Sequence, residues 1–273
     1  MMDFTFGIIT DFKNESKLSN LISSIENQKI NNYQIILVGS KERKSIDNLY
    51  SLNPKINIID FDETKKEGWI TKKKNLITNN AIYENIVYLH DYLLLDNEWY
   101  SGFERFGNSF DICMNKISNL DGSRYRDWCL SPQNFKNIDK ILKKNLEYLL
   151  PYSEVELSRY MYISGAYWVA KKSVMTKYPL NENLSWGDGE DIEWSHRVRD
   201  KHNFKFNEYS VVKLQKSKDV IMNEISDENL ELFKKLESKI YFQSLDNALA
   251  GFRRSIFLLS KKLKYLRTKL NFF

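Results

Sequence analysis

The chain has 273 residues, of which 42% are hydrophobic and 28% are charged, and its formal net charge is +5. This length provides for one large domain, or for one domain with an appendage. The small net charge gives no indication of nucleic-acid binding, so we expect no nucleic-acid partner, and the two cysteines are too few for a disulfide framework. The N-terminal segment lacks the features of a signal peptide, and no run of about 18 apolar residues is present, so we expect a cytoplasmic protein.

The first 91 residues alternate between short apolar runs, typical of buried strands, and segments in which apolar residues recur at helical spacing. The segment 18–25, for example, repeats apolar residues at i, i+3, i+4 and i+7, which places them on one helix face. The predicted strands are Phe4–Thr10, Gln34–Gly39, Ile56–Phe61 and Ile86–Leu89, and the predicted helices are 18–25, Ser45–Tyr50 and Asn75–Tyr83.

Strands that alternate with helices predict a parallel sheet with right-handed crossovers. Ligands of such sheets bind outside the carboxyl ends of the strands. All four predicted strands end in polar or small residues, which predicts a shared binding crevice; the alternative is that each strand simply ends in a polar turn. The residues concerned are Thr10 and Asp11, Gly39 and Ser40, Asp60 and Asp62, and His90 and Asp91.

The alternation of strands and helices fades after residue 91. The pattern beyond it predicts less regular structure, with an acidic, glycine-containing stretch before the last well-defined helix. We predict a strand at Ile112–Asn115, a polar loop at 119–132, helices at Ile138–Leu150 and from about Asp191 to Lys201, an aromatic segment at Tyr160–Ala170, a hairpin at Phe204–Leu214, and helical structure from Asp227 onward.

Several common catalytic motifs are absent from the sequence. It has no glycine-rich phosphate-binding loop, no Cys/His zinc spacing and no G-x-S-x-G nucleophile elbow, which excludes most kinases, P-loop NTPases and Rossmann dehydrogenases. His90 and Asp91, directly after a predicted buried strand, are a carboxylate and an imidazole that could together hold a divalent cation and so neutralise leaving-group charge. The alternative is a turn in which Asp91 caps the strand.

Three consecutive lysines, Lys72–Lys74, stand beside a predicted helix start in the stretch "EGWITKKKNLI". Ammonium groups and the free amides of a helix N-terminus both suit phosphate. The alternative is a solvated basic face without a ligand.

The stretch "LSWGDGEDIEW", residues 184–194, crowds carboxylates between two glycines and two tryptophans. Acids at the start of a helix can cap its free amides, and Asp188 is the expected cap. Capping alone leaves the crowding and the flanking Trp186 and Trp194 without explanation. A hydroxyl-bearing ligand would explain both, because indole covers the apolar face of a sugar and a carboxylate can accept a proton from an attacking hydroxyl.

Taken together, these stretches resemble the GT-A glycosyltransferases, especially bacterial family-2-like enzymes of surface-polysaccharide synthesis. "WGDGED" is similar to the W-G-x-G-E-D element of beta-1,4-galactosyltransferases, and the resemblance covers roughly Phe4 to Leu214. It implies an α/β, Rossmann-like GT-A fold: a mixed, mostly parallel sheet flanked by helices. It also implies one domain at 1–218, with a nucleotide-binding half at 1–91 and an acceptor half at 92–218, followed by a C-terminal helical extension at 219–273.

The resemblance also implies roles for individual residues. Asp191 would be the catalytic base in an inverting displacement, and Glu190 would bind or orient the acceptor. His90 and Asp91 would occupy the place of the metal site, for Mn²⁺ or Mg²⁺, although Tyr92 replaces the last acid of the usual D-x-D pattern. The nucleotide-binding candidates are Thr10, Asp11, Gly39, Asp60, Lys74 and Asn75, and the acceptor-binding candidates are Trp186, Gly187 and Asp188.

The C-terminal segment 252–273 has a different character from the rest of the chain. Residues 251–273 contain seven basic residues and no acid, so removing +7 from the net charge of +5 leaves −2 for the first 250 residues. Apolar residues recur in this segment at steps of four and three, which predicts a basic amphipathic helix. We expect it to lie on an anionic membrane surface; the alternatives are pairing with a second copy in a homodimer and docking onto the body of the protein.

The sequence therefore predicts an inverting glycosyltransferase that moves a sugar from a nucleotide-sugar donor, such as a UDP-sugar, to a hydroxyl of a glycan or lipid-linked acceptor. The expected context is the synthesis of bacterial lipopolysaccharide or capsule, at the inner face of the cytoplasmic membrane. The alternatives are a catalytically inactive carbohydrate-binding or scaffold protein and a nucleotidyltransferase.

Overall fold

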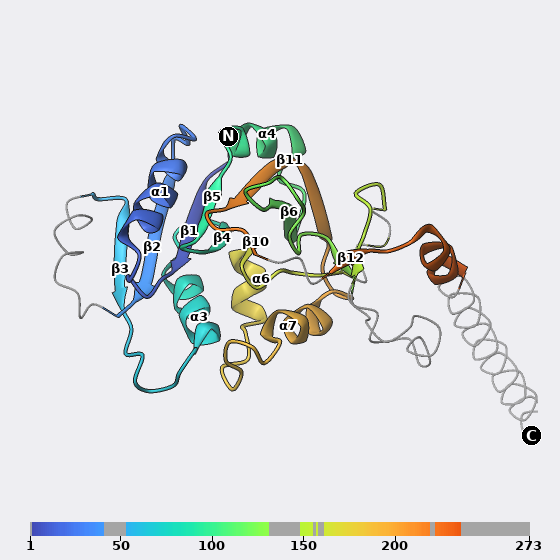
Figure 1. Ribbon diagram of the computed structural model, residues 1–273. Helices are drawn as coiled ribbons and strands as arrows, with labels where there is room; N and C mark the ends of the chain where they lie inside the picture. The colour runs from blue at the N-terminus through green and yellow to red at the C-terminus, as the bar shows by residue number, and fades with distance from the viewer. Residues whose placement is uncertain are drawn as a thin grey trace, which may run out of the picture. The chain divides into compact units, whose positions relative to one another are not determined.

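The structure is a computed structural model, and it describes residues 2–40, 53–130, 148–154, 157, 161–218 and 222–235 (Figure 1). The chain divides into two compact units, Met1–Glu224 and Ile225–Phe273. In the second unit, the described residues 227–235 are helical. The predicted helix at Ser45–Tyr50 and the basic segment 252–273 lie outside the described residues. No helix in the described ranges is long and apolar enough to cross a membrane.

The N-terminal half forms the parallel sheet that the alternating pattern predicts. Its strands are adjacent in the order β3-β2-β1-β4, and every neighbouring pair among them is parallel. β1 and β4 are almost completely buried, as expected for strands covered on both faces. The elements are β1 (Phe4–Ile9), α1 (Glu15–Glu26), β2 (Tyr33–Gly39), β3 (Ile56–Asp60), α3 (Ile70–Asn80) and β4 (Asn85–His90).

The C-terminal half extends this sheet with strands of both directions. Eight of the described strands form one sheet in the order β3-β2-β1-β4-β10-β6-β11-β5, in which β10 is antiparallel to both neighbours. Four short strands form a second sheet in the order β12-β8-β7-β9. This mixed, mostly parallel arrangement is the GT-A fold class expected from the sequence. The elements are β5 (Leu93–Leu95), α4 (Trp99–Phe106), β6 (Ile112–Ser118), β7 (Cys129–Leu130), β8 (Tyr148–Leu149), β9 (Met161–Tyr162), β10 (Tyr167–Lys171), α6 (Lys172–Lys177), α7 (Glu190–Val198), β11 (Phe204–Leu214) and β12 (Asn223–Glu224).

Three sequence predictions of secondary structure are wrong. The segment Phe204–Leu214 is one strand instead of a hairpin, because it pairs in parallel with β6 on both sides of a register shift between Asn207 and Val211. The helix predicted at Asn75–Tyr83 begins at Ile70, so the three lysines lie within it. The helix predicted at Ile138–Leu150 does not include Tyr148–Leu149, which form β8, and most of its remaining length lies outside the described residues.

Aromatic side chains form much of the core between the sheet and α4. The rings of Phe4 and Trp99 meet edge to face with their centroids 5.2 Å apart, and those of Phe4 and Phe103 do so at 5.4 Å. In Figure 1, α4 lies on the opposite side of the molecule from α3, α6 and α7. The sheet is therefore held from both sides, and the loops at the carboxyl ends of β1 and β4 rest on a rigid base.

The close approach of α3 to β1 depends on a glycine. A Cβ atom at Gly7 would overlap the side chain of Ile77, which is fully buried. We expect Gly7→Ala to lower the free energy of unfolding by about 1–3 kcal/mol, because overpacking forces α3 away from the strand. Urea denaturation measures this change. Ser19→Ala, on the exposed face of α1, is the control and should change stability by less than about 0.5 kcal/mol; equal stability of Gly7→Ala and the wild type would contradict the packing argument.

Candidate active site

A cavity of about 390 Å³ opens where the carboxyl end of β4 faces the beginning of α7. It forms there because β10 runs antiparallel to β4, which brings the segment Ser164–Ala166 beside the end of β4. The backbone amide of His90 donates to the carbonyl oxygen of Ala166 at 3.2 Å. The cavity therefore combines a strand end of the first half with a helix start of the second.

Asp191 lies in the wall of this cavity and is held by backbone amides. Its carboxylate accepts hydrogen bonds from the amides of Gly165 at 2.9 Å and Ile192 at 2.9 Å. A Cβ atom at Gly165 would lie 3.0 Å from the carboxylates of both Asp191 and Glu190, so a side chain there would displace both by a few tenths of an ångström. Two amide donors at the start of a helix fix the orientation of the carboxylate. No cation within the described residues forms an ion pair with Asp191, which leaves acceptor capacity for a ligand hydroxyl.

Glu190 is engaged differently from its neighbour. Its carboxylate forms an ion pair with the ammonium group of Lys74 at 3.2 Å, and the two side chains are only 7% and 1% exposed. The same ammonium group donates to the carbonyl oxygen of Gly165 at 3.0 Å and lies 4.5 Å from the ring centroid of Trp168. Burial lowers the pKa of Lys74, and the carboxylates of Glu190 and Asp191 oppose that shift. Lys74 thus joins α3 to the acidic helix start from inside the protein.

The loop before α7 is shaped by glycines. Gly187 and Gly189 have φ angles of 90° and 71°, a region that other residues adopt only with strain. The predicted cap is wrong: Gly189 occupies the N-cap position without a side-chain cap, and Asp188 instead accepts a hydrogen bond from the amide of Ser185 at 2.8 Å. Trp186 lines the cavity and is 74% exposed, and its amide is held by the carbonyl oxygen of Gly68 at 2.8 Å. The loop therefore presents an open indole beside Asp191.

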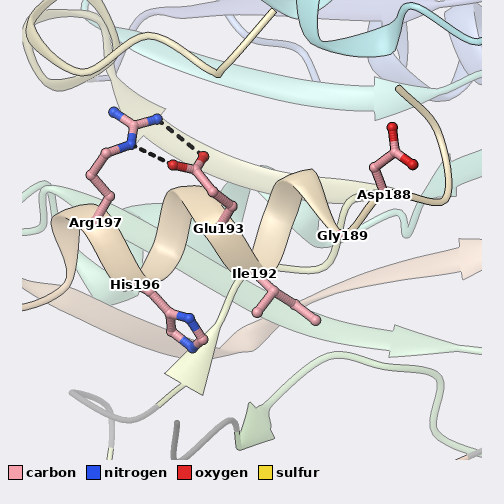
Figure 2. A pocket seen from close by; sticks show the side chains of 6 residues that line it. All are labelled: Asp188, Gly189, Ile192, Glu193, His196 and Arg197. Carbon is pink, nitrogen blue, oxygen red and sulfur yellow. Dashed lines mark hydrogen bonds and ion pairs between the residues drawn. The ribbon is translucent and has the colours of Figure 1, made fainter. Parts of the chain in front are cut away.

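The outer side of α7 borders a second, more open cavity of about 590 Å³ (Figure 2). Glu193 forms an ion pair with Arg197 at 2.9 Å, one turn along the helix. Figure 2 shows Ile192 and His196 projecting away from this pair. Gly189 and Ile192 line both cavities, so the two lie on either side of the start of α7. Glu193 is thus engaged by Arg197 on the helix surface.

The strand ends β1 and β4 meet through a side-chain hydrogen bond. The Thr10 hydroxyl donates to the Asp91 carboxylate at 2.8 Å and accepts from the Phe12 amide at 2.9 Å. Burial raises the pKa of Asp91, and the hydrogen bond from Thr10 opposes the shift. At Gly39, a Cβ atom would overlap the carbonyl oxygen of Thr10, so the ends of β1 and β2 can approach only without a side chain there.

The other nucleotide-binding candidates lie in different surroundings. Asp11 is exposed and pairs with Lys13 at 3.2 Å, and Asp60 is exposed at the end of β3. The Asn75 side chain is buried and holds a remote segment: it donates to the carbonyl oxygen of Leu180 at 2.9 Å and to Glu182 at 3.0 Å. The structure thus brings Thr10 and Asp91 together, and separately Lys74 with Glu190 and Asp191, whereas Asn75 is committed to the segment before the glycine loop.

The residues at the expected metal position do not form a complete ligand set. The imidazole of His90 is neutral over most of the pH range, because burial and the nearby Lys74 and Lys218 lower its pKa to about 3. Among the described residues, no group of three or more His, Cys, Asp or Glu side chains could hold a metal ion. The third position carries Tyr92, whose pKa is raised by burial. His90 and Asp91 alone therefore provide too few ligands to hold a divalent metal.

The structure adds cavity residues that sequence reasoning did not assign. Tyr125, Arg126 and Lys218 line the same wall as Tyr92. Arg126 has a positive φ angle of 32° and donates to the hydroxyl of Tyr162 at 3.0 Å. Arg126 lies in the polar loop that the sequence indicates, but neither its backbone strain nor the position of Lys218 leaves a signal in the sequence.

Comparisons with known proteins show the fold. No family model matches the chain, and no curated protein matches it. Among solved structures, GalNAc-T7 with UDP, GalNAc and Mn²⁺ matches with a TM-score of 0.56 and 13% identity over 78% of this chain. Residues 1–349 of TarS from S. aureus match with a TM-score of 0.51 and 11% identity over 77% of this chain. The match spans 43% and 60% of those two chains, respectively, and both are glycosyltransferases of the GT-A fold.

The buried pair of Lys74 and Glu190 leads to a stability prediction. Lys74→Met leaves the Glu190 carboxylate buried without its cation, and we expect the free energy of unfolding to fall by about 3–5 kcal/mol. Lys72→Met is the matched control, because Lys72 forms a half-exposed ion pair with Glu182 at 3.0 Å and should cost about 0–1 kcal/mol. Chemical denaturation of both variants provides the comparison. The double variant Lys74→Met with Glu190→Leu should recover much of the loss; no recovery would show that the pair is not the cause.

His90 should make the free energy of unfolding depend on pH. The pKa of His90 is lowered from 6.5 to about 3 in the folded state, so between these values the unfolded chain binds a proton that the folded chain does not. The free energy of unfolding should therefore fall as the pH drops through this window, by up to about 1.4 kcal/mol per pH unit from this one group.

Urea denaturation between pH 7 and pH 4, in the presence of a chelator, tests the contribution of His90. His90→Gln should flatten the pH dependence relative to the wild type. His196→Gln is the control, because His196 lies on the outer side of α7 (Figure 2). An unchanged pH dependence in His90→Gln would show that the imidazole is not the responsible group.

Proposed function

We propose that this protein is a glycosyltransferase that moves a sugar from a nucleotide-sugar donor to a hydroxyl group of a carbohydrate-containing acceptor. The observation that carries the proposal is the position of Asp191. Its carboxylate is held by two backbone amides at a helix start, in the same cavity as an exposed indole, Trp186. A fixed carboxylate beside an apolar platform suits a sugar hydroxyl, because indole covers the ring face while the carboxylate accepts the hydroxyl proton.

The residues of the cavity have different roles in the proposed reaction. The acceptor hydroxyl gives its proton to Asp191 as its oxygen forms a bond to the anomeric carbon of the donor sugar. The bond from that carbon to the diphosphate breaks, and its electron pair leaves with the nucleoside diphosphate. Glu190 is already neutralised by Lys74 and orients the acceptor, whereas Trp186 and the glycines beside it provide the surface against which the acceptor ring packs. Attack from the side opposite the leaving group would invert the anomeric carbon.

The proposal also names a donor, an acceptor and a biological setting. We take a UDP-sugar as the donor, because GalNAc-T7, which shares the fold, is solved with UDP. The nucleoside would lie at the ends of β1 to β3, near Thr10, Asp11, Gly39 and Asp60. The acceptor would be a glycan or lipid-linked intermediate of bacterial surface polysaccharide. The basic amphipathic pattern of 252–273 supports this choice, because such a helix would keep the enzyme at an anionic membrane surface.

The base assignment has a direct test. Asp191→Asn keeps the size of the side chain but cannot accept a proton, so we expect sugar transfer to fall by about 10²–10⁴-fold while UDP binding stays unchanged. Release of UDP and formation of product are measured together, with calorimetry for nucleotide affinity. Glu193→Gln is the control on the same helix, because its carboxylate faces Arg197 and should be dispensable.

Two results would count against the proposal. Transfer by Asp191→Asn at the wild-type rate would remove Asp191 from the role of base. Failure of the wild type to release a nucleoside diphosphate from any common nucleotide sugar, with or without manganese, would overturn the enzyme proposal and favour a carbohydrate-binding protein.

A further inference from the structure

A lysine from the segment after β11, Lys218, lies over the aromatic ring of Tyr92 in the turn after β4. The ammonium group of Lys218 lies over the ring of Tyr92, 3.8 Å from its centroid, and 5.7 Å from the centroid of the Tyr125 ring. Lys218 is solvent-accessible and lines the cavity that also contains Asp191. Its charge is therefore available to a ligand in that cavity.

The backbone holds Lys218 at this position. Gln215, which follows β11, fastens the β4–β5 turn: its amide donates to the carbonyl oxygen of Tyr92 at 2.8 Å, and its side chain donates to the carbonyl oxygens of Asp91 and Leu93, each at 3.2 Å. Three residues later, the amide of Lys218 donates to the side chain of Asn119 at 3.0 Å. The backbone around Lys218 is thus anchored at two places, through Gln215 to the β4–β5 turn and through Asn119 to the loop after β6.

The charge around this lysine is unbalanced. Burial lowers the pKa of Lys218, and two further cations, Arg126 and Lys17, lower it again. Within the described part of the chain, no carboxylate forms an ion pair with Lys218; its contacts are the two tyrosine rings. A lysine that lines a cavity and forms no ion pair with a described carboxylate favours an anionic ligand.

The same cations disfavour a divalent metal at this position. Lys218 and Arg126 line the same cavity as His90, so positive charge already lies beside the expected ligand. The one carboxylate of the pair, Asp91, is engaged by the hydroxyl of Thr10. A nucleoside diphosphate brings negative charge to this place, and lysine and arginine both suit phosphate oxygens.

We propose that Lys218, together with Arg126, binds the diphosphate of the donor and neutralises the leaving group, so that neither step depends on a divalent metal. This inference rests on the proposed glycosyltransferase function and names the groups that assist departure. When the bond between the anomeric carbon and the diphosphate oxygen breaks, the electron pair stays on that oxygen, and the ammonium group of Lys218 balances the new charge. The proton of the acceptor hydroxyl goes to Asp191.

Calorimetry with UDP and uridine, in the presence of EDTA, separates the diphosphate from the nucleoside. The wild type should bind UDP under these conditions. Lys218→Gln should weaken UDP binding by about tenfold or more and uridine binding by less than about twofold, because only the charge-assisted contact is lost. Lys218→Arg should keep UDP affinity within about threefold of the wild type. Lys216→Gln, two residues earlier and exposed, is the matched control and should behave as the wild type.

The rate of sugar transfer, measured with EDTA and with manganese, is the second part of the test. The wild type should turn over at the same rate in EDTA and in manganese, and Lys218→Gln should lose transfer in both. Two results would overturn the inference but leave the proposed function standing. One is UDP binding or sugar transfer that disappears in EDTA and returns with manganese. The other is a UDP affinity of Lys218→Gln equal to that of the wild type. Failure of UDP, GDP, CDP and ADP to bind with or without manganese would instead overturn the proposed function itself. Thermal unfolding of each variant confirms that a lost affinity does not reflect a lost fold.

Discussion

The buried ammonium group of Lys74 is the interaction on which the site depends. It bonds at once to the carboxylate of Glu190 and the carbonyl oxygen of Gly165, and it faces the ring of Trp168. These partners belong to α7, to the segment before β10 and to β10 itself. One charge therefore ties the helix of the first half, α3, to the acidic start of α7. The amide of Gly165 holds Asp191 at the same point, so the orientation of the candidate base follows from the pair next to it.

The cavity has one wall with acidic side chains and one with basic side chains. The wall formed by α7 carries carboxylates whose positions are fixed by amides and by Lys74, whereas the wall at the end of β4 carries Tyr92, Arg126 and Lys218. A donor that is anionic at one end and a sugar at the other would meet complementary charge along its length. Tyr92 contributes to this division, because its aromatic ring holds the ammonium group of Lys218 at the end of β4.

The sequence predicted those features that depend on local pattern. Alternating apolar runs indicated β1, β2, β3 and β4, and the acidic glycine-rich stretch indicated a helix start with Asp191 in it. Some of the errors share a cause, since the feature depends on a partner in another segment of the chain. The strand β11 is continuous because β6 lies beside it, and the lysines belong to α3 because Glu63, Glu182 and Glu190 neutralise them from other segments. Asp188 bonds to Ser185 rather than capping α7, since Gly189 takes that position.

The sequence by itself determined the class of the fold, the polar strand ends and the identity of the acids at the start of α7, because periodicity and residue chemistry are properties of neighbours along the chain. Only the tertiary structure showed that Glu190 has a cationic partner and Asp191 has amide partners, since Lys74 is 116 residues from Glu190 in sequence. It alone placed Lys218 over Tyr92, because that contact joins the end of β11 to the end of β4. Charges interact through space, so the distribution of charge in the cavity depends on residues that the fold brings together from the two halves of the sheet.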